Sequence, residues 1–194
     1  SVYISSGTWS LIGTENTYPV LSEKAQTANF ANEGAAAGRY CFLKNIMGMW
    51  LFQNIRKNLD KKFTYDEMMY MAMESSYDKL IDPTADCFLA PENMTAEINA
   101  AVGKELTIGE MAYVIYDNLA RYYDIALKAL ESVTGETYDT LNIIGGGSKN
   151  GFLNELTNNV ELSVHVLVTV DLVSIERSVL KLSVIVNDAL GNIH

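Results

Sequence analysis

The sequence is poor in the residues that build disulfide frameworks, metal centres and nucleic-acid surfaces. Among 194 residues it has two cysteines, two histidines, three prolines and 14 lysines and arginines, against 24 aspartates and glutamates. Two isolated thiols, Cys41 and Cys87, without C-x-x-C spacing, argue against a disulfide scaffold and indicate a reducing compartment. The net charge of −10 argues against a nucleic-acid or anionic-membrane surface, because such a surface needs a basic patch.

Long apolar runs are also missing from the sequence. No uninterrupted apolar stretch reaches the about 18 residues that span a bilayer. The first residues lack the basic-then-apolar plan of a signal peptide, so we expect a soluble, cytoplasmic protein. Apolar residues make up 48% of the chain and charged residues 20%, as in an ordinary globular domain. An acidic domain can still bind a nucleotide, because backbone amides hold phosphate locally.

The first motif is "YISSGTWSLIG", residues 3–13. Apolar residues alternate on both sides of Ser5-Ser6-Gly7-Thr8, and this pattern predicts two strands joined by a bend. Hydroxyls and a glycine in such a bend can donate hydrogen bonds to phosphate, although an ordinary Ser-Gly hairpin turn has the same composition.

The next segments are predicted to be a polar loop over 14–32 and a helix over about 33–59. Apolar residues recur every three or four positions in the second segment, which is the helical period. At about 100° per residue, a different side of that helix carries a partly polar strip. The strip consists of Asn45, Met49, Gln53 and Arg56. Such a strip is solvent-exposed in an ordinary surface helix, and it lines a cleft if a ligand binds there.

Two capping boxes predict the next helices. Thr64 with Glu67 opens a methionine-rich helix to about residue 76, and Thr107 with Glu110 opens a long one that ends near 133, before Gly135. Methionines at this spacing are expected to fill the core. The loop "DPTADCFLAPENM" between the helices is expected on the surface. The apolar stripe predicted for the long helix includes Met111, Val114, Ile115, Leu119, Tyr122, Ile125, Ala126 and Leu130.

The segment "LNIIGGGSKNGFLNEL" predicts a strand, a glycine turn and a helix. The strand covers 141–144, the turn 145–148 and the helix begins at Asn150. This geometry lets a ligand meet bare backbone at a helix N-terminus, although many such turns bind nothing. From Val160 onward, a Val- and Leu-rich pattern predicts two strands around Glu176-Arg177, with His165 as a core or edge residue rather than a ligand.

Taken together, these stretches resemble the C-terminal domain of FGGY-type carbohydrate kinases. "YISSGTWSLIG", "NEGAAAGRYCFLKNIMGMWLFQ" and "LNIIGGGSKNGFLNEL" each look like stretches of that family, in the same order and at similar spacing. "CFLAPENM" and "TGETYDTLNII" fit as well. The likeness covers about residues 2–158. The combination is specific, whereas any one of the motifs alone is not.

The resemblance implies an α/β fold of the ribonuclease H-like, actin-like ATPase type, with a mixed sheet flanked by helices. Residues 1–194 would form the C-terminal ATP-binding domain, and ATP and sugar would bind between it and an N-terminal domain of the same kinase. ATP and Mg²⁺ are the implied cofactors, and a ketose is the implied acceptor, L-rhamnulose before fuculose or xylulose. Thr8, Gln53 and Gly146 match ATP-contacting positions, and Asn45 matches a sugar-contacting one.

Two features depart from the family pattern. The carboxylate that accepts the proton of the sugar hydroxyl lies, in the family, before the first motif, so no catalytic residue and no metal ligand is assigned in this chain. The family also continues with a stretch like "GxPVxxGPxEATAxGN", whereas residues 160–194 are atypical. An artificial tail, a changed reading frame or real divergence would each explain that difference.

Two other functions remain open from the sequence. A free-standing actin-like module could bind nucleotide or a partner without turnover. A purely structural helical domain would need none of the matched residues, and in it Gly146→Val would change stability alone.

Overall fold

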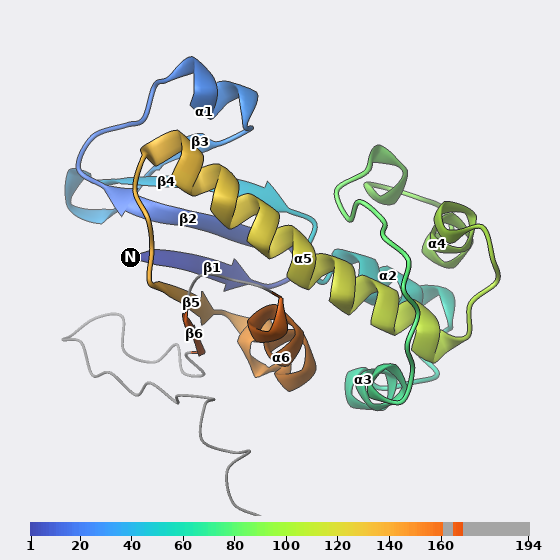
Figure 1. Ribbon diagram of the computed structural model, residues 1–194. Helices are drawn as coiled ribbons and strands as arrows, with labels where there is room; N and C mark the ends of the chain where they lie inside the picture. The colour runs from blue at the N-terminus through green and yellow to red at the C-terminus, as the bar shows by residue number, and fades with distance from the viewer. Residues whose placement is uncertain (161–164, 169–194) are drawn as a thin grey trace, which may run out of the picture.

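The protein is described by a computed structural model over residues 1–160 and 165–168. Within these residues, a six-stranded sheet has the order β3-β4-β2-β1-β5-β6 (Figure 1). Its strands are β1 (Val2–Ser6), β2 (Ser10–Asn16), β3 (Ala31–Gly34), β4 (Tyr40–Ile46), β5 (Thr140–Ile144) and β6 (His165–Val168). β1, β2, β4 and β3 pair antiparallel, and β5 and β6 continue parallel to β1. The predicted mixed α/β sheet is confirmed.

Six α-helices accompany the sheet in the described part of the chain. They are α1 (Glu23–Thr27), α2 (Trp50–Asn58), α3 (Tyr65–Met73), α4 (Met94–Val102), α5 (Ile108–Thr134) and α6 (Gly151–Asn159). Short 3-10 turns are η1 (Ala36–Gly38), η2 (Asp86–Phe88) and η3 (Gly146–Lys149). None of these described helices is both long enough and apolar enough to cross a membrane.

The helix α5 organises the core. It crosses one face of the sheet, α6 lies beside it, and α2, α3 and α4 gather around its N-terminal end (Figure 1). The fully buried side chains Ile4 and Ile12 project from neighbouring strands, and Tyr116 and Tyr123 project from α5. One apolar core therefore joins the sheet to this helical cluster.

Both capping boxes are confirmed. The Thr64 hydroxyl accepts a hydrogen bond from the Glu67 amide, and the Thr107 hydroxyl accepts one from the Glu110 amide. In each box the glutamate carboxylate accepts a hydrogen bond from the backbone amide of the capping threonine. These backbone hydrogen bonds lower the pKa of both glutamates. Gly135 ends α5 in the left-handed conformation, with φ of 73°. Local sequence therefore sets these helix ends.

The prediction of one helix over 33–59 is wrong for its first half. Residues 31–46 form the β3–β4 hairpin, and the helix α2 begins only at Trp50. The strand β4 pairs with β2 over seven residues, from Asn16 opposite Tyr40 to Ser10 opposite Ile46. These long-range backbone bonds outweigh a helical spacing of apolar residues that a buried strand also tolerates.

Three smaller predictions also need correction. The segment 14–32, expected to be a loop, contains the end of β2, the helix α1 and the start of β3. Ile125, assigned to the buried stripe of α5, is 56% exposed because it lies on the outer side of that helix. The segment 82–94, expected to be a surface loop, is not wholly on the surface, since Phe88 of η2 and Met94 at the start of α4 are buried.

The remaining sequence predictions fall at the end of the chain. The strand, glycine turn and helix from residue 140 to 159 are confirmed as β5, η3 and α6. His165 is exposed and begins β6, which ends the described sheet order, so it is an edge residue as expected. The predicted pair of strands around Glu176-Arg177 lies outside the described residues.

A buried asparagine fixes the segment after α3 on α5. Asn118 is 3% exposed. Its Oδ1 accepts from the Ile81 amide at 2.9 Å, and its Nδ2 donates to the carbonyl oxygens of Lys79 at 2.9 Å and Val114 at 2.8 Å. These bonds join an irregular segment to the central helix.

Replacing this side chain should destabilise the fold. In Asn118→Ala the Ile81 amide and the Lys79 carbonyl lose their partner, so the free energy of unfolding should fall by about 1–3 kcal/mol. Asn158→Ala, at an exposed position of α6, should change it by less than about 0.5 kcal/mol. Urea denaturation measures both. Equal effects of the two substitutions would contradict the assigned role of Asn118.

Candidate functional site

The bend Gly7–Trp9, which joins β1 to β2, is docked on the start of α2. The Gly7 carbonyl accepts a hydrogen bond from the Met49 amide at 3.0 Å, and the Thr8 carbonyl accepts one from the Trp50 amide at 2.9 Å. No side chain in the described part of the protein caps α2. The bend therefore satisfies donors that the first turn of a helix leaves unpaired.

The same contact brings Thr8 and Gln53 together. The Gln53 Nε2 lies 3.1 Å from the Thr8 Oγ1, and the Gln53 Oε1 lies 3.3 Å from it. Thr8 is exposed and Gln53 is half-buried, so both polar ends are available to a ligand. Two of the residues predicted to contact ATP thus touch each other across 45 positions of the chain.

The glycine turn meets the end of β1. A Cβ on Gly145, whose φ is +89°, would lie 2.6 Å from the Ser6 carbonyl oxygen, and a Cβ on Gly147 would lie 2.1 Å from the Ser6 Oγ. Both glycines are therefore required by close packing. A Cβ on Gly146 would meet no atom within 4 Å. At this position the fold itself does not require a glycine.

These segments surround one hollow of about 440 Å³, a volume within the range of ligand sites. The bend contributes Gly7 and Thr8, α2 contributes Gln53, and the turn contributes Gly146. The three positions predicted for ATP contact, Thr8, Gln53 and Gly146, therefore line a shared cavity. Met49, of the strip predicted from the helical spacing, lines it as well.

Several lining residues were not singled out from the sequence. Lys149 and Asn150 follow the triple glycine directly, and their adjacency to the motif could have identified them. Tyr65 and Asp66, which begin α3, also line the hollow, together with Met69. Nothing in the sequence near the capping box of α3 indicates that this helix end shares a hollow with the glycine turn.

The α3 wall of the hollow is held by aromatic and cationic contacts. The Arg56 guanidinium lies 4.8 Å from the centroid of the Tyr65 ring, and Phe52 stacks on that ring from α2. On the side of the glycine turn, Asn150 donates to the Tyr116 hydroxyl at 2.9 Å. Burial raises the pKa of Tyr116, so its phenol stays neutral. The lining of the hollow thus combines an aromatic ring and a carboxylate from α3 with the glycine turn.

Asn45 lies outside this hollow. It pairs with Leu11 in the β2–β4 ladder, next to Ile46, which is buried beside Ser10. Because neighbouring side chains of a strand point to opposite faces, exposed Asn45 belongs to the sheet face turned away from α5. It is near the base of the bend, on the far side of the strands from the α5 core. The prediction that Asn45 and Gln53 share one helical strip is wrong.

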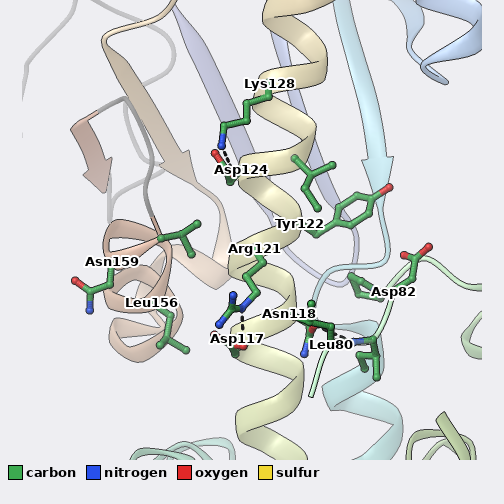
Figure 2. A pocket seen from close by; sticks show the side chains of 14 residues that line it. Leu80, Asp82, Asp117, Asn118, Arg121, Tyr122, Asp124, Lys128, Leu156 and Asn159 are labelled. Atoms are coloured by element: carbon green, nitrogen blue, oxygen red, sulfur yellow. Dashed lines mark hydrogen bonds and ion pairs between the residues drawn. The ribbon is translucent and has the colours of Figure 1, made fainter. Parts of the chain in front are cut away.

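A second hollow of about 830 Å³ lies along the outer side of α5, between α6 and the segment around Leu80 (Figure 2). Four of its charged side chains form two pairs within α5, and Asp82 accepts hydrogen bonds from the Thr84 amide and hydroxyl. Arg121 Nε is 2.8 Å from Asp117 Oδ2, and Lys128 Nζ is 2.8 Å from Asp124 Oδ2. None of the residues predicted to contact ATP or sugar lines it. The larger volume of this hollow therefore does not make it the candidate nucleotide site.

Metal ligands do not converge in the described part of the chain. Among residues 1–160 and 165–168, no group of three or more His, Cys, Asp and Glu side chains is placed to hold a metal ion. Both cysteines are free; Cys41 is half-buried and Cys87 is exposed. Asp66 is the carboxylate that lines the smaller hollow.

A comparison with known protein families identifies the family of this chain. Residues 2–168 match the model described as "FGGY family of carbohydrate kinases, C-terminal domain". The chain belongs to the FGGY family of carbohydrate kinases. The match extends past residue 158, so the first strand of the atypical tail, β6, still belongs to the FGGY domain.

Curated FGGY relatives include several rhamnulokinases. The chain is 43% identical over 162 residues to the rhamnulokinase of Oceanobacillus iheyensis and 41% identical over 161 residues to that of Bacillus subtilis. Each alignment covers 80% of this chain, but 34% and 33% of the relatives. The chain therefore spans about a third of the length of these curated relatives.

Solved structures of FGGY kinases share the fold. The xylulose kinase of Bifidobacterium adolescentis superposes with a TM-score of 0.58 at 20% identity, over 88% of this chain and 34% of the other. A xylulose-kinase-type structure from Brucella ovis gives 0.59 at 14% identity, over 86% and 35%. At these identities the likeness concerns the fold alone, and it confirms the predicted fold class.

The two glycines of the turn should respond differently to alanine. Gly147→Ala places a Cβ against Ser6 and should lower the free energy of unfolding by about 1–3 kcal/mol. Gly146→Ala meets open space at a residue without positive φ and should change it by less than about 0.5 kcal/mol. Urea denaturation of both variants is the test. A comparable loss at Gly146 would mean that the fold, not a ligand, requires that glycine.

Proposed function

We propose that this chain is the ATP-binding, C-terminal part of a sugar kinase that transfers the γ-phosphoryl group of ATP to a ketose. L-Rhamnulose is the proposed acceptor and L-rhamnulose 1-phosphate the product. The observation that carries the proposal is the convergence of Thr8, Gln53 and Gly146 on one hollow. The identity of 43% to a rhamnulokinase supports the choice of sugar.

The polar residues that line the hollow suit the phosphates of a nucleoside triphosphate. Phosphoryl transfer needs positioning and charge stabilisation more than covalent help from the protein. The hydroxyl of Thr8 and the amide of Gln53 can donate to phosphate oxygens, and Lys149, which also lines the hollow, adds positive charge. The absence of any side chain at Gly146 lets the adenosine approach the turn.

The acceptor sugar is proposed to lie on the other side of the bend. Asn45 occupies the sheet face turned away from α5, beside the strand that leads out of the bend. A phosphoryl group held at Thr8 would therefore stand between nucleotide and ketose. No residue of this chain is proposed as the catalytic base or as a ligand of Mg²⁺, and both functions are assigned to the N-terminal domain of the whole kinase. Two free cysteines support a cytoplasmic location for that protein.

The nucleotide site can be tested on the chain itself. Gln53→Ala removes a phosphate-facing amide and should weaken Mg-ATP binding by about tenfold or more, because hydrogen bonds to charged groups are the stronger ones. Asn54→Ala is the matched control, because Asn54 lies on the same helix and donates to the Trp50 carbonyl at 2.8 Å rather than lining the hollow. Isothermal titration calorimetry measures both. Equal affinities of the two variants would refute the placement of ATP.

The catalytic proposal requires the other half of the cleft. Joined to the N-terminal part of the Oceanobacillus iheyensis rhamnulokinase, the chain should phosphorylate L-rhamnulose with ATP and Mg²⁺, faster than it phosphorylates fuculose or xylulose. Residues 1–194 alone should bind ATP weakly and give no turnover. A coupled ADP-release assay measures both. ATP binding without turnover by the joined protein would favour a non-catalytic nucleotide-binding module. Turnover by the isolated chain would refute the assignment of the catalytic base to the N-terminal domain.

A further inference from the structure

A cluster of buried hydroxyls lies beneath the Gly7–Trp9 bend. The hydroxyl cluster consists of Ser6, at the end of β1, Ser10, at the start of β2, and Tyr123, from the middle of α5. Their exposures are 2%, 0% and 1%. The Ser10 Oγ lies 2.7 Å from the Tyr123 hydroxyl. The cluster is therefore internal to the protein and cannot itself touch a ligand in the hollow.

The position of the cluster departs from the pattern of the strands that carry it. On the strand faces turned to α5, Ile4 of β1 and Ile12 of β2 are apolar, and the next residues toward the bend on that face, Ser6 and Ser10, are serines. Burying a hydroxyl is unfavourable unless it is hydrogen-bonded. Among the described residues, the Ser6 Oγ makes no hydrogen bond of standard geometry. Stability of the core alone would favour apolar side chains here.

The hydroxyl cluster touches three of the segments that line the hollow or lead to it. Ser6 and Ser10 are the residues from which the bend departs and to which it returns. A Cβ on Gly147 would lie 2.1 Å from the Ser6 Oγ, so Ser6 supports the glycine turn. A Cβ on Gly48 would lie 2.8 Å from the Ser10 Oγ, so Ser10 supports the residues that lead into α2.

The Tyr123 phenol is hydrogen-bonded to Ser10. Burial raises the pKa of Tyr123, and the hydrogen bond to Ser10 offsets that shift only in part. The phenol therefore keeps its proton and remains a donor. Phenylalanine would fill the same space in the core, so the contribution specific to tyrosine at this position is the hydroxyl group.

We propose that Tyr123 is a positioning residue, whose hydroxyl acts through Ser10 to fix the bend against the start of α2. The inference rests on the proposed function, because the bend is taken to hold the phosphates of ATP. Tyr123 makes no contact with the nucleotide. Its loss should therefore weaken the binding of phosphates and leave the binding of the nucleoside unchanged.

The experiment compares Tyr123→Phe with Tyr138→Phe in the full 194-residue chain. Tyr138 is also buried, and its hydroxyl lies 3.4 Å from the Thr134 Oγ1, away from the hollow. Two quantities are measured: hydrogen exchange of the Gly7, Met49 and Trp50 amides, which bond within or to the bend, and the affinities for Mg-ATP and for adenosine.

For Tyr123→Phe, exchange of those amides should accelerate by about fivefold to tenfold, the change expected from one lost buried hydrogen bond. Mg-ATP affinity should fall by a similar factor, while adenosine affinity should stay within about twofold. Tyr138→Phe should leave exchange at the bend and the ratio of the two affinities at the wild-type values. Ser10→Ala should reproduce Tyr123→Phe, and the double variant should add little, because both substitutions break the same bond.

Three outcomes would overturn the positioning role. Exchange at the bend could be unchanged in Tyr123→Phe, the two ligands could weaken equally, or Tyr138→Phe could give the same pattern. If Tyr123→Phe does not fold, the same measurements are made on Ser10→Ala, which removes the same hydrogen bond with a smaller change in side-chain volume. Failure of the wild-type chain to bind Mg-ATP would instead count against the proposed function, and the exchange measurement would still decide whether Tyr123 positions the bend.

Discussion

The arrangement of the site depends on the docking of the Gly7–Trp9 bend on the first turn of α2. Two carbonyls of the bend accept from the Met49 and Trp50 amides. A helix start needs such acceptors, and here a distant hairpin supplies them instead of a capping side chain. The backbone contact therefore fixes the distance between Thr8 and Gln53, and the same hairpin meets the glycine turn through Ser6.

The sheet gives these contacts a common frame. Because β5 runs parallel beside β1, the ends of both strands point the same way, and the turn after β5 stands next to the bend after β1. Side chains on one face of these strands enter the α5 core, and those on the other face are turned away from it. The proposed nucleotide and acceptor positions therefore fall on opposite sides of one bend.

Sequence patterns predicted the parts of the protein that local chemistry determines. The capping boxes at Thr64 and Thr107, the end of α5 at Gly135 and the turn around Gly146 all appear as expected, because each depends on a few neighbouring residues. The segment 33–46 was misassigned, because its apolar spacing suits both a helix and a strand buried in a sheet. Only the partner strand β2 distinguishes the two.

The candidate site likewise has features that local sequence predicts and features that depend on distant partners. The motifs and their chemistry could be predicted from the sequence, and the resemblance to the family added the positions Thr8, Gln53, Gly146 and Asn45. Only the folded structure shows that the first three share a hollow, that Asn45 lies on another face, and that Tyr65 lines the same hollow. The reason is physical: a residue's chemistry is local, whereas its neighbours across the site are set by strand pairing and by packing on α5, which join positions far apart in the chain.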